Sequence, residues 1–267
     1  MIKLVVTDID GTILGENNTF RPRIIETVER LKKAGIPIVL ATGRVFAGVY
    51  PVAKQLGIDT PIICSQGSIV RHHENMLWER PVKHEIAREV IEVLREKGVH
   101  TNVYTNDMIY VEDERLMDEY TTGRFVTYEL IDNFDNLKFG RVSKLLAITH
   151  DEGEMVNLCC ELSERYKGVL NICRSHKYYL EFTDIEATKG SAMRHLADLW
   201  GIKQEEIFAS GDNDNDVELL LNAGIRVATD NATDALKRVA QHICPHVDLD
   251  GWADAIEKFV LEGVTCE

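Results

Sequence analysis

Two carboxylates and a glycine follow the first apolar run of the chain. Residues 2–6 are mostly apolar and rich in β-branched side chains, and Asp8, Asp10 and Gly11 come soon after them. Such a run predicts a buried strand that delivers both carboxylates to its C-terminal end. Residues two apart in a strand face the same side, about 6.5 Å from each other. Asp8 and Asp10 can therefore converge on one ligand, although a solvated turn gives the same pattern.

A second acidic segment lies late in the chain, where Asp212, Asp214 and Asp216 fall within five residues. Like charges about 4 Å apart repel by about 4 kcal/mol at an effective dielectric constant of 20. A cluster formed by this loop and the first strand therefore requires a counter-ion. Carboxylate oxygens favour Mg²⁺, which keeps several waters and is shared with substrate phosphate in many enzymes.

Two further segments supply groups that suit an anion. Thr42 and Gly43 follow an apolar run at 36–40 and precede a predicted helix, so a hydroxyl and an accessible N–H would lie at a helix N-terminus. Lys189 begins another predicted helix and carries a positive charge. Taken alone, the Thr-Gly pair is more typical of a helix cap and the lysine of a solvated surface.

In order and position, these segments resemble the motifs of the haloacid dehalogenase superfamily. The matching residues are Asp8-Ile9-Asp10-Gly11-Thr12, Thr42-Gly43-Arg44, Lys189-Gly190 and Gly211-Asp212-Asn213-Asp214-Asn215-Asp216. The resemblance covers nearly the whole chain. The motifs and their spacing together resemble the Cof-like phosphatase branch of this superfamily, whose members carry a type IIB cap.

The resemblance implies a role for each motif residue. Asp8 would be the nucleophile that forms an aspartyl phosphate, and Asp10 would act as acid and then as base. Lys189 would hold Asp8 and the phosphoryl group together. The implied phosphate-binding residues are Ile9, Thr42, Gly43, Lys189 and Asn215; the metal ligands are Asp8, Asp10 through its backbone carbonyl, and Asp212; Arg44 contacts the substrate, and Asp216 supports the site from behind.

Hydrophobic periodicity predicts an α/β fold. Strands at 2–6, 36–40 and 61–64 alternate with helices, which indicates a doubly wound parallel sheet, a Rossmann-like core. A central first strand, with strands two and three on one side and the later pair on the other, would place a topological switch point beside Asp8.

The pattern changes after residue 83. Helices at 84–97, 114–122 and 152–165 alternate with hairpin-like strands near 100–111, 143–149, 169–173 and 177–183, which predicts an inserted α+β cap domain. The expected domains are therefore a core of residues 1–83 and 185–267 and a cap of residues 84–184. In the resembling family a cap is inserted at this position.

Composition limits the possible partners. The 267 residues are 45% hydrophobic and carry a net charge of −14, which disfavours nucleic acid and anionic membranes as partners. No apolar run approaches the roughly 18 residues of a membrane span. Because Met1-Ile2-Lys3 leads directly into the first predicted strand, we expect no signal peptide. We expect a cytoplasmic protein whose partner is a small phosphorylated metabolite. The pattern does not indicate an oligomeric state.

These observations predict a Mg²⁺-dependent phosphatase that hydrolyses small phosphorylated metabolites, such as sugar phosphates or similar phosphomonoesters, through an aspartyl phosphate. The alternatives are a phosphomutase of the same superfamily and a receiver-like phosphoacceptor protein, which would be about half this length. A zinc site at His242, Cys244 and His246 is disfavoured because Pro245 interrupts the segment and no fourth ligand is apparent. The family usually has Asn-Gly-Ala where this chain has Gln66-Gly67-Ser68, so substrate contacts made by that motif do not carry over.

Overall fold

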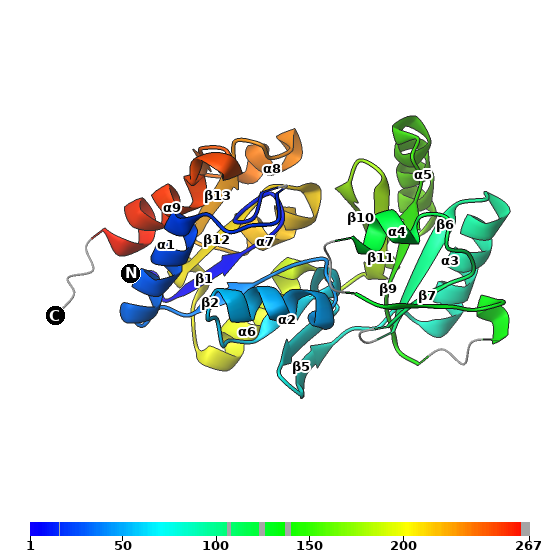
Figure 1. The fold of residues 1–267 in the computed structure, drawn as a ribbon, viewed down its shortest axis with the longest axis horizontal. Coiled ribbons are helices and arrows are strands. Elements are labelled where there is room, and N and C mark those ends of the chain that lie inside the picture. The colour runs from blue at the N-terminus through cyan, green and yellow to red at the C-terminus, as the bar shows by residue number, and fades with distance from the viewer. Residues whose placement is uncertain (16, 106–107, 123–125, 137–139, 263–267) are drawn as a thin grey trace.

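The computed structural model describes residues 1–262 except 16, 106–107, 123–125 and 137–139. The chain forms two lobes (Figure 1). The first lobe contains both ends of the described chain, from β1 to β5 and from α6 onward. The second lobe is formed by the intervening elements, from α3 to β11. Residues 106–107, inside the predicted 100–111 strand region, lie outside the described residues.

The elements of the first lobe begin and end close to the predicted positions. Its strands are β1 (Leu4–Thr7), β2 (Ile38–Leu40), β3 (Ile62–Cys64), β4 (Ile69–His72), β5 (Asn75–Glu79), β12 (Ile207–Gly211), β13 (Ile225–Thr229) and β14 (His242–Cys244). Its helices are α1 (Pro22–Lys33), α2 (Phe46–Gln55), α6 (Lys189–Trp200), α7 (Val217–Leu221), α8 (Asp234–Val239) and α9 (Gly251–Ile256), with shorter helical segments η1 (Ser65–Gly67), η3 (Gln204–Glu206), η4 (Asp214–Asp216), η5 (Val247–Leu249) and η6 (Glu257–Leu261).

A parallel sheet with the strand order β14-β13-β12-β1-β2 forms the centre of this lobe. A parallel bridge between Ala41 and Ile63 adds β3 beyond β2. The prediction of β1 between β2 and the later strands is therefore confirmed. Edge strand β14 extends the sheet further than the sequence indicated. Because β1 and β12 are adjacent and parallel, the loops after both strands lie at the same edge of the sheet.

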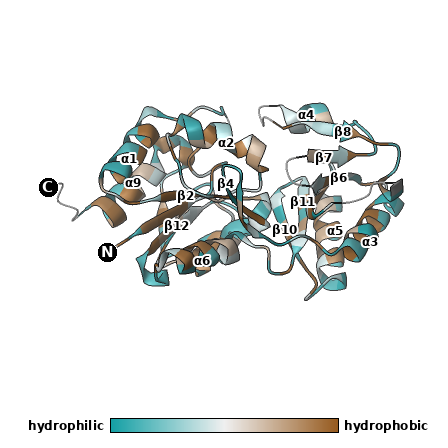
Figure 2. Cartoon of the chain, turned by 90° about the horizontal axis from the view of Figure 1, so that it is seen from below, coloured by the Kyte–Doolittle hydropathy of each residue, from teal (hydrophilic) through white to brown (hydrophobic). Residues whose placement is uncertain are grey.

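Helices cover both faces of this sheet. Alternate residues of β1 point to opposite sides, and since they are apolar on both sides, each face needs a covering layer. Leu4 and Val6 pack with residues of α6, α7 and α8, whereas Val5 packs with residues of α1, α2 and α9. Figure 2 shows α1 and α9 on one side of the sheet and α6 on the other. The predicted doubly wound, Rossmann-like core is thus confirmed.

The second lobe is an α+β unit with its own core. Its elements are α3 (His84–Glu96), β6 (His100–Thr105), β7 (Met108–Val111), α4 (Met117–Thr121), β8 (Tyr128–Leu130), η2 (Phe134–Asn136), β9 (Val142–Ile148), α5 (Glu152–Arg165), β10 (Leu170–His176) and β11 (Tyr179–Asp184). The strands form one sheet in the order β10-β11-β9-β6-β7-β8. Residues of α3 and α5 pack on one face of this sheet. On the opposite face, Val45 of the first lobe packs with Tyr104 and Leu146. The predicted fold class is confirmed.

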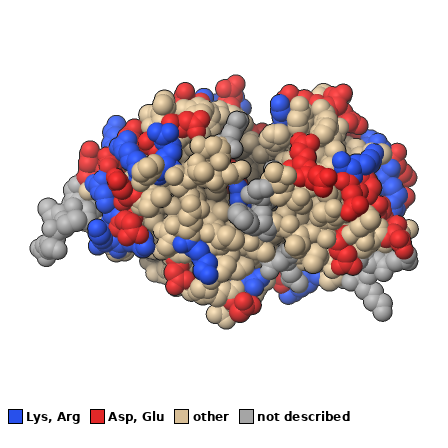
Figure 3. All heavy atoms as spheres, viewed as in Figure 1, with Lys and Arg blue, Asp and Glu red and all other residues tan. Residues whose placement is uncertain are grey.

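On the face drawn in Figure 3, acidic and basic side chains are interspersed over both lobes, and the outline is notched between the lobes. Among the residues that the structure describes, no helix has the length and apolar character needed to cross a membrane.

Gly67 allows η1 to contact the start of α6. Its φ is +93°, and a Cβ at this position would lie 2.1 Å from the carbonyl oxygen of Thr188, the residue that precedes α6. Only glycine tolerates both this backbone conformation and this close approach. The contact fixes the Gln66-Gly67-Ser68 segment against the helix that carries Lys189.

We expect Gly67→Ala to lower the free energy of unfolding by about 3 kcal/mol, since the methyl group adds overpacking to an unfavourable backbone conformation. Urea unfolding followed by circular dichroism measures the change. Gly98→Ala is the matched control, because Gly98 also has a positive φ, +69°, and a Cβ there would meet none of the described residues within 4 Å. Equal stabilities of the two variants would contradict the proposed contact.

Candidate active site

Asp8 lies immediately after β1 and is almost completely buried, with 6% of its surface exposed. Its Oδ1 accepts a hydrogen bond of 2.6 Å from Lys189 Nζ, which donates a second one of 2.6 Å to Asp216 Oδ1. Lys189 is itself 1% exposed. One buried ammonium group therefore joins the first motif, through Asp8, to the last motif, through Asp216.

Local structure explains how Lys189 reaches the site. Thr188 caps α6: its side chain accepts a hydrogen bond from the Ser191 N–H, and the Ser191 side chain accepts one from the Thr188 N–H. This capping box begins the helix at Lys189. Although burial by itself disfavours the ammonium, Asp216 and Asp8 raise the pKa of Lys189 above its ordinary value, so the side chain stays charged.

The loop after β12 brings two more carboxylates to this point. Asp216 is buried, and its Oδ2 accepts hydrogen bonds from the backbone N–H groups of Asp212 (3.1 Å) and Asn213 (3.2 Å). Asp212 Oδ1 accepts one of 2.9 Å from Thr12 Oγ1. Gly11 makes this approach possible, since a Cβ there would lie 2.3 Å from Asp212 Oδ2. A glycine is therefore required at position 11, because any side chain there would displace Asp212.

Asp8, Asp212 and Asp216 form a group that could hold a cation: one oxygen of each lies within 4.8 Å of the others. Burial, with smaller contributions from Asp216 and Asp10 and opposed by Lys189, raises the pKa of Asp8 to about 7. Burial and then Asp8 also raise the pKa of Asp212 well above its ordinary value. An anionic cluster that resists its own ionisation fits a hard divalent cation.

Asp216 differs from its two neighbours in this cluster. Its oxygens are engaged by Lys189 and by two backbone N–H groups. This arrangement fits a residue that positions Lys189 and the loop, with Asp8 and Asp212 nearer to the role of cation ligands. The described residues contain a second metal-capable group, which is largely exposed and consists of Asp59 before β3 and His72 and His73 at the β4–β5 hairpin. His242 and Cys244 belong to neither group.

Asp10 and Arg44 contact each other across the site. Arg44 donates hydrogen bonds to both carboxylate oxygens of Asp10, from Nε at 2.8 Å and from Nη2 at 2.5 Å. The Asp10 side chain is 51% exposed, whereas that of Arg44 is 10% exposed. The predicted acid–base residue therefore lies on the solvent side of Asp8, and the predicted substrate contact lies beside it.

Besides Lys189, the predicted phosphate-binding residues follow three adjacent strands, β1, β2 and β12. Ile9 is buried after β1, and Thr42 is buried after β2, where its Oγ1 accepts a hydrogen bond from the Arg44 N–H. A Cβ on Gly43 would lie 2.5 Å from Gln66 Nε2. Asn215 donates a hydrogen bond of 2.9 Å to Gln66 Oε1. Gln66 thus contacts the surroundings of two residues that the sequence analysis placed on the phosphate.

Sequence analysis missed two charged residues of the second lobe at this place. Lys144 of β9 donates a hydrogen bond of 2.8 Å to the Gly43 carbonyl, and Glu181 of β11 accepts one of 2.8 Å from Gln66 Nε2. Both lie in strands that are otherwise largely buried. A charged residue inside an apolar strand was the available signal, since such residues are rarely buried unless they are paired.

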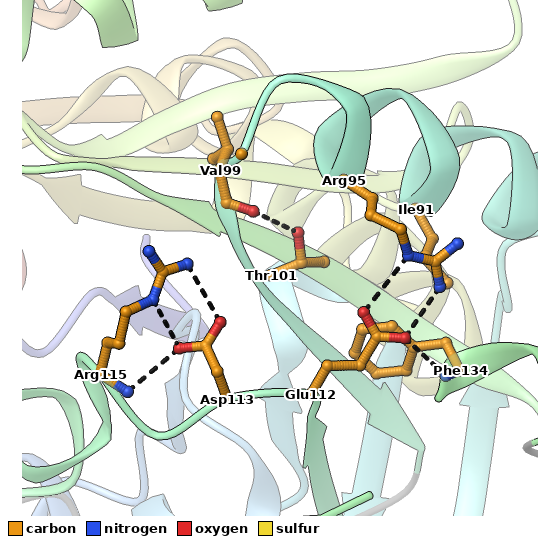
Figure 4. A pocket seen from close by; sticks show the side chains of 9 residues that line it. Ile91, Arg95, Val99, Thr101, Glu112, Asp113, Arg115 and Phe134 are labelled. Carbon is orange, nitrogen blue, oxygen red and sulfur yellow. Dashed lines mark hydrogen bonds and ion pairs between the residues drawn. The ribbon is translucent and has the colours of Figure 1, made fainter. Parts of the chain in front are cut away.

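A cleft in the second lobe is separate from these strand ends. It lies where α3, β6 and the segment after β7 meet, and its charged groups are paired within it (Figure 4). Arg95 donates a hydrogen bond of 2.8 Å to Glu112, and Arg115 donates one of 3.0 Å to Asp113. The cleft contains none of the predicted catalytic residues.

Comparison with known proteins agrees with this geometry. Residues 5–256 match the family model described as haloacid dehalogenase-like hydrolase. The chain belongs to this family. A putative phosphatase of Haemophilus influenzae is 32% identical over 97% of this chain and 98% of its own length. A pyridoxal phosphate phosphatase of Escherichia coli is 27% identical and covers 97% of both chains.

A solved structure shows the same fold. The haloacid dehalogenase-like hydrolase of Bacteroides thetaiotaomicron superposes with a TM-score of 0.84, at 28% identity, over 97% of this chain and 99% of that chain. The resemblance inferred from the four motifs is therefore confirmed, and so is the prediction that this haloacid dehalogenase-like hydrolase is an enzyme of the phosphatase class.

Buried Asp8 predicts a pH dependence of stability in protein stripped of divalent cations. The pKa of Asp8 is about 7 in the folded chain against an ordinary value of 3.8, so the folded state binds the extra proton between these values. The resulting stability is fully present below about pH 4 and is lost as pH rises through about 7.

Urea unfolding in excess chelator, repeated from about pH 5 to about pH 8, measures this loss, which we expect to reach a few kcal/mol. Asp8→Asn lacks the titrating group, so its stability should fall less over the same range. Equal slopes for the two proteins would contradict the assignment.

Proposed function

We propose that this protein is a Mg²⁺-dependent phosphatase that hydrolyses small phosphorylated metabolites through an aspartyl phosphate on Asp8. One observation carries the proposal: the Asp8 carboxylate, at the end of the central strand, is held by Lys189 and lies within 4.8 Å of Asp212. A carboxylate fixed in this way is aimed and needs no reorganisation before it attacks.

The proposed reaction has two displacements on phosphorus. In the first, an Asp8 oxygen bonds to phosphorus while the ester oxygen leaves and takes a proton from Asp10. In the second, water attacks the aspartyl phosphate, gives its proton to Asp10 and releases inorganic phosphate with Asp8 restored. Asp10 thus acts as acid and then as base, and its partly exposed side chain can exchange protons with solvent.

Charge on the transferred phosphoryl group requires donors on several sides. Lys189 supplies one through its buried ammonium. We assign the Ile9 and Gly43 backbone, the Thr42 hydroxyl and the Asn215 amide as further donors, because these residues lie at the ends of β1, β2 and β12. Arg44, which donates a hydrogen bond to Asp10, contacts the substrate from the same side as Asp10.

The buried carboxylates fit Mg²⁺, with Asp8, the Asp10 carbonyl and Asp212 as its proposed protein ligands. When bound, the cation would neutralise charge on the phosphate oxygens and on the nucleophile. Asp216 supports this set by holding Lys189 and the backbone of Asp212.

We propose that residues 84–184 are a cap that contacts the leaving group and excludes water, with residues 1–83 and 185–267 as the catalytic core. Relatives named as phosphatases, one of them acting on pyridoxal phosphate, support small phosphomonoesters as the substrate class. Family membership favours this function over a receiver-like switch. A phosphomutase would differ in requiring an added bisphosphate for turnover.

Asp8→Asn tests the nucleophile. The amide is a far poorer nucleophile, so we expect kcat for p-nitrophenyl phosphate to fall more than about a hundredfold, equivalent to about 2.7 kcal/mol. Phosphate release measures turnover, and circular dichroism verifies the fold. A folded variant that keeps more than about a hundredth of wild-type kcat would exclude Asp8 as the nucleophile.

Thermal unfolding tests the cation site without measuring activity. Mg²⁺ should raise the Tm of the wild-type protein in a saturable manner, because a ligand that binds only the folded state stabilises it. Asp212→Asn should lose most of this increase. Asp214→Asn is the matched control from the same loop, since an amide oxygen can still accept the hydrogen bond from Thr233. If both variants respond like the wild type, Asp212 is not a ligand.

A further inference from the structure

A buried ion pair of the second lobe contacts the first lobe beside the proposed phosphate-binding residues. Lys144 and Glu181, from neighbouring strands β9 and β11, are 1% and 4% exposed, with Lys144 Nζ 2.5 Å from Glu181 Oε2. The same Nζ donates to the Gly43 carbonyl at 2.8 Å. Taking two charges out of water is costly unless the surrounding hydrogen bonds compensate. The proposed chemistry does not by itself use this pair.

A chain of hydrogen bonds leads from this pair to the acidic loop after β12. Glu181 Oε1 accepts from Gln66 Nε2 at 2.8 Å and from Ser175 Oγ at 2.5 Å. Gln66 Oε1 in turn accepts from Asn215 Nδ2 at 2.9 Å. Gln66 is 2% exposed and adopts a φ of +61°, a conformation that most side chains avoid. The surrounding structure therefore holds it firmly in this position.

The order of donors and acceptors in this chain has only one consistent direction. An ionised carboxylate accepts hydrogen bonds and cannot donate them. Burial would raise the pKa of Glu181, but Lys144, Ser175 and Gln66 together hold it below its ordinary value, so the carboxylate stays charged. Gln66 must then turn its NH₂ group to Glu181 and its oxygen to Asn215. Asn215 must therefore donate to this oxygen from its own NH₂ group.

Asn215 shows that this orientation is imposed from outside. Its Oδ1 is buried and has no hydrogen-bond partner among the described residues. An unpaired buried acceptor is unfavourable, so the amide is not in this orientation for the sake of its own hydrogen bonds. The remaining N–H of the same NH₂ group is the donor that a phosphate oxygen requires.

The glycine of the Thr42-Gly43 motif has a second purpose in this arrangement. A Cβ on Gly43 would lie 2.5 Å from Gln66 Nε2 and 3.2 Å from Glu181 Oε1. A side chain at position 43 would therefore displace the Gln66 amide. The motif that binds phosphate and the contact between the lobes share the same space.

We propose that Glu181, paired with Lys144, is a positioning residue of the second lobe that orients the Asn215 amide through Gln66, so that the phosphate site is complete only while the lobes are in contact. The inference rests on the proposed function, in which Asn215 binds phosphate. It predicts that the second lobe affects binding of the phosphoryl group itself, whatever the leaving group is.

Inhibition by inorganic phosphate tests this inference, because phosphate has no leaving group. Glu181→Gln and Gln66→Ala should each raise the inhibition constant of phosphate about tenfold or more, since an oriented hydrogen bond to an anion is lost. KM for p-nitrophenyl phosphate should rise by a similar factor. Gln66→Ala leaves no buried charge unpaired, so it provides the answer if Glu181→Gln does not fold. Glu79→Gln is the control, because it weakens a separate and more exposed contact between the lobes, the ion pair of Glu79 with Arg141.

A double-mutant cycle distinguishes this positioning role from a general loss of packing. Asn215→Ala should weaken phosphate binding, and adding Gln66→Ala to it should cost less than about twofold more, because both act through one hydrogen bond to phosphate. Independent, additive effects would overturn the inference. So would wild-type phosphate inhibition in folded Gln66→Ala when Asn215→Ala is impaired. If Asn215→Ala itself binds phosphate normally, the assignment of Asn215 within the proposed function is wrong, and the inference fails with it.

Discussion

The buried ammonium of Lys189 is the interaction on which the site depends. It bonds to Asp8 and to Asp216, and without it three acidic side chains would face one another in a region of low exposure. Three carboxylates against one ammonium still leave two negative charges when all are ionised. A divalent cation matches that remainder, which is why the charge balance alone favours a metal-assisted reaction at this place.

Strand geometry explains why residues so distant in the sequence meet. Parallel strands β1 and β12 are adjacent, so the segments that follow them emerge at one edge of the sheet. The capping box of Thr188 and Ser191 begins α6 at Lys189 and places this residue at the same edge. Glycines permit the last few ångströms of approach: Gly11 admits Asp212, and Gly67 admits the backbone before α6. The site is thus built on rigid elements whose backbones touch, which favours precise positioning.

Contact between the lobes is polar where it reaches the site and apolar beside it. Val45 packs into the core of the second lobe, while Lys144 and Glu181 bring a buried charge pair against Gly43 and Gln66. Apolar packing tolerates small displacements, whereas a buried charge with fixed partners is satisfied in only one arrangement. The polar contacts therefore define the relative position of the lobes at the place where chemistry requires accuracy.

The sequence by itself determined the architecture and the chemical inventory. Periodicity predicted the alternating core and the inserted α+β unit, because each depends on patterns within a few residues. The resemblance of the four motifs, which include Asp8, Lys189 and Asp212, to those of the haloacid dehalogenase superfamily indicated phosphoryl transfer. Only the tertiary structure decided which polar groups meet. Gln66 pairs with Asn215 across 149 positions and with Glu181 across 115, and no local pattern encodes such a partnership. Long-range hydrogen bonds depend on how two packed lobes are placed, which requires the whole folded chain.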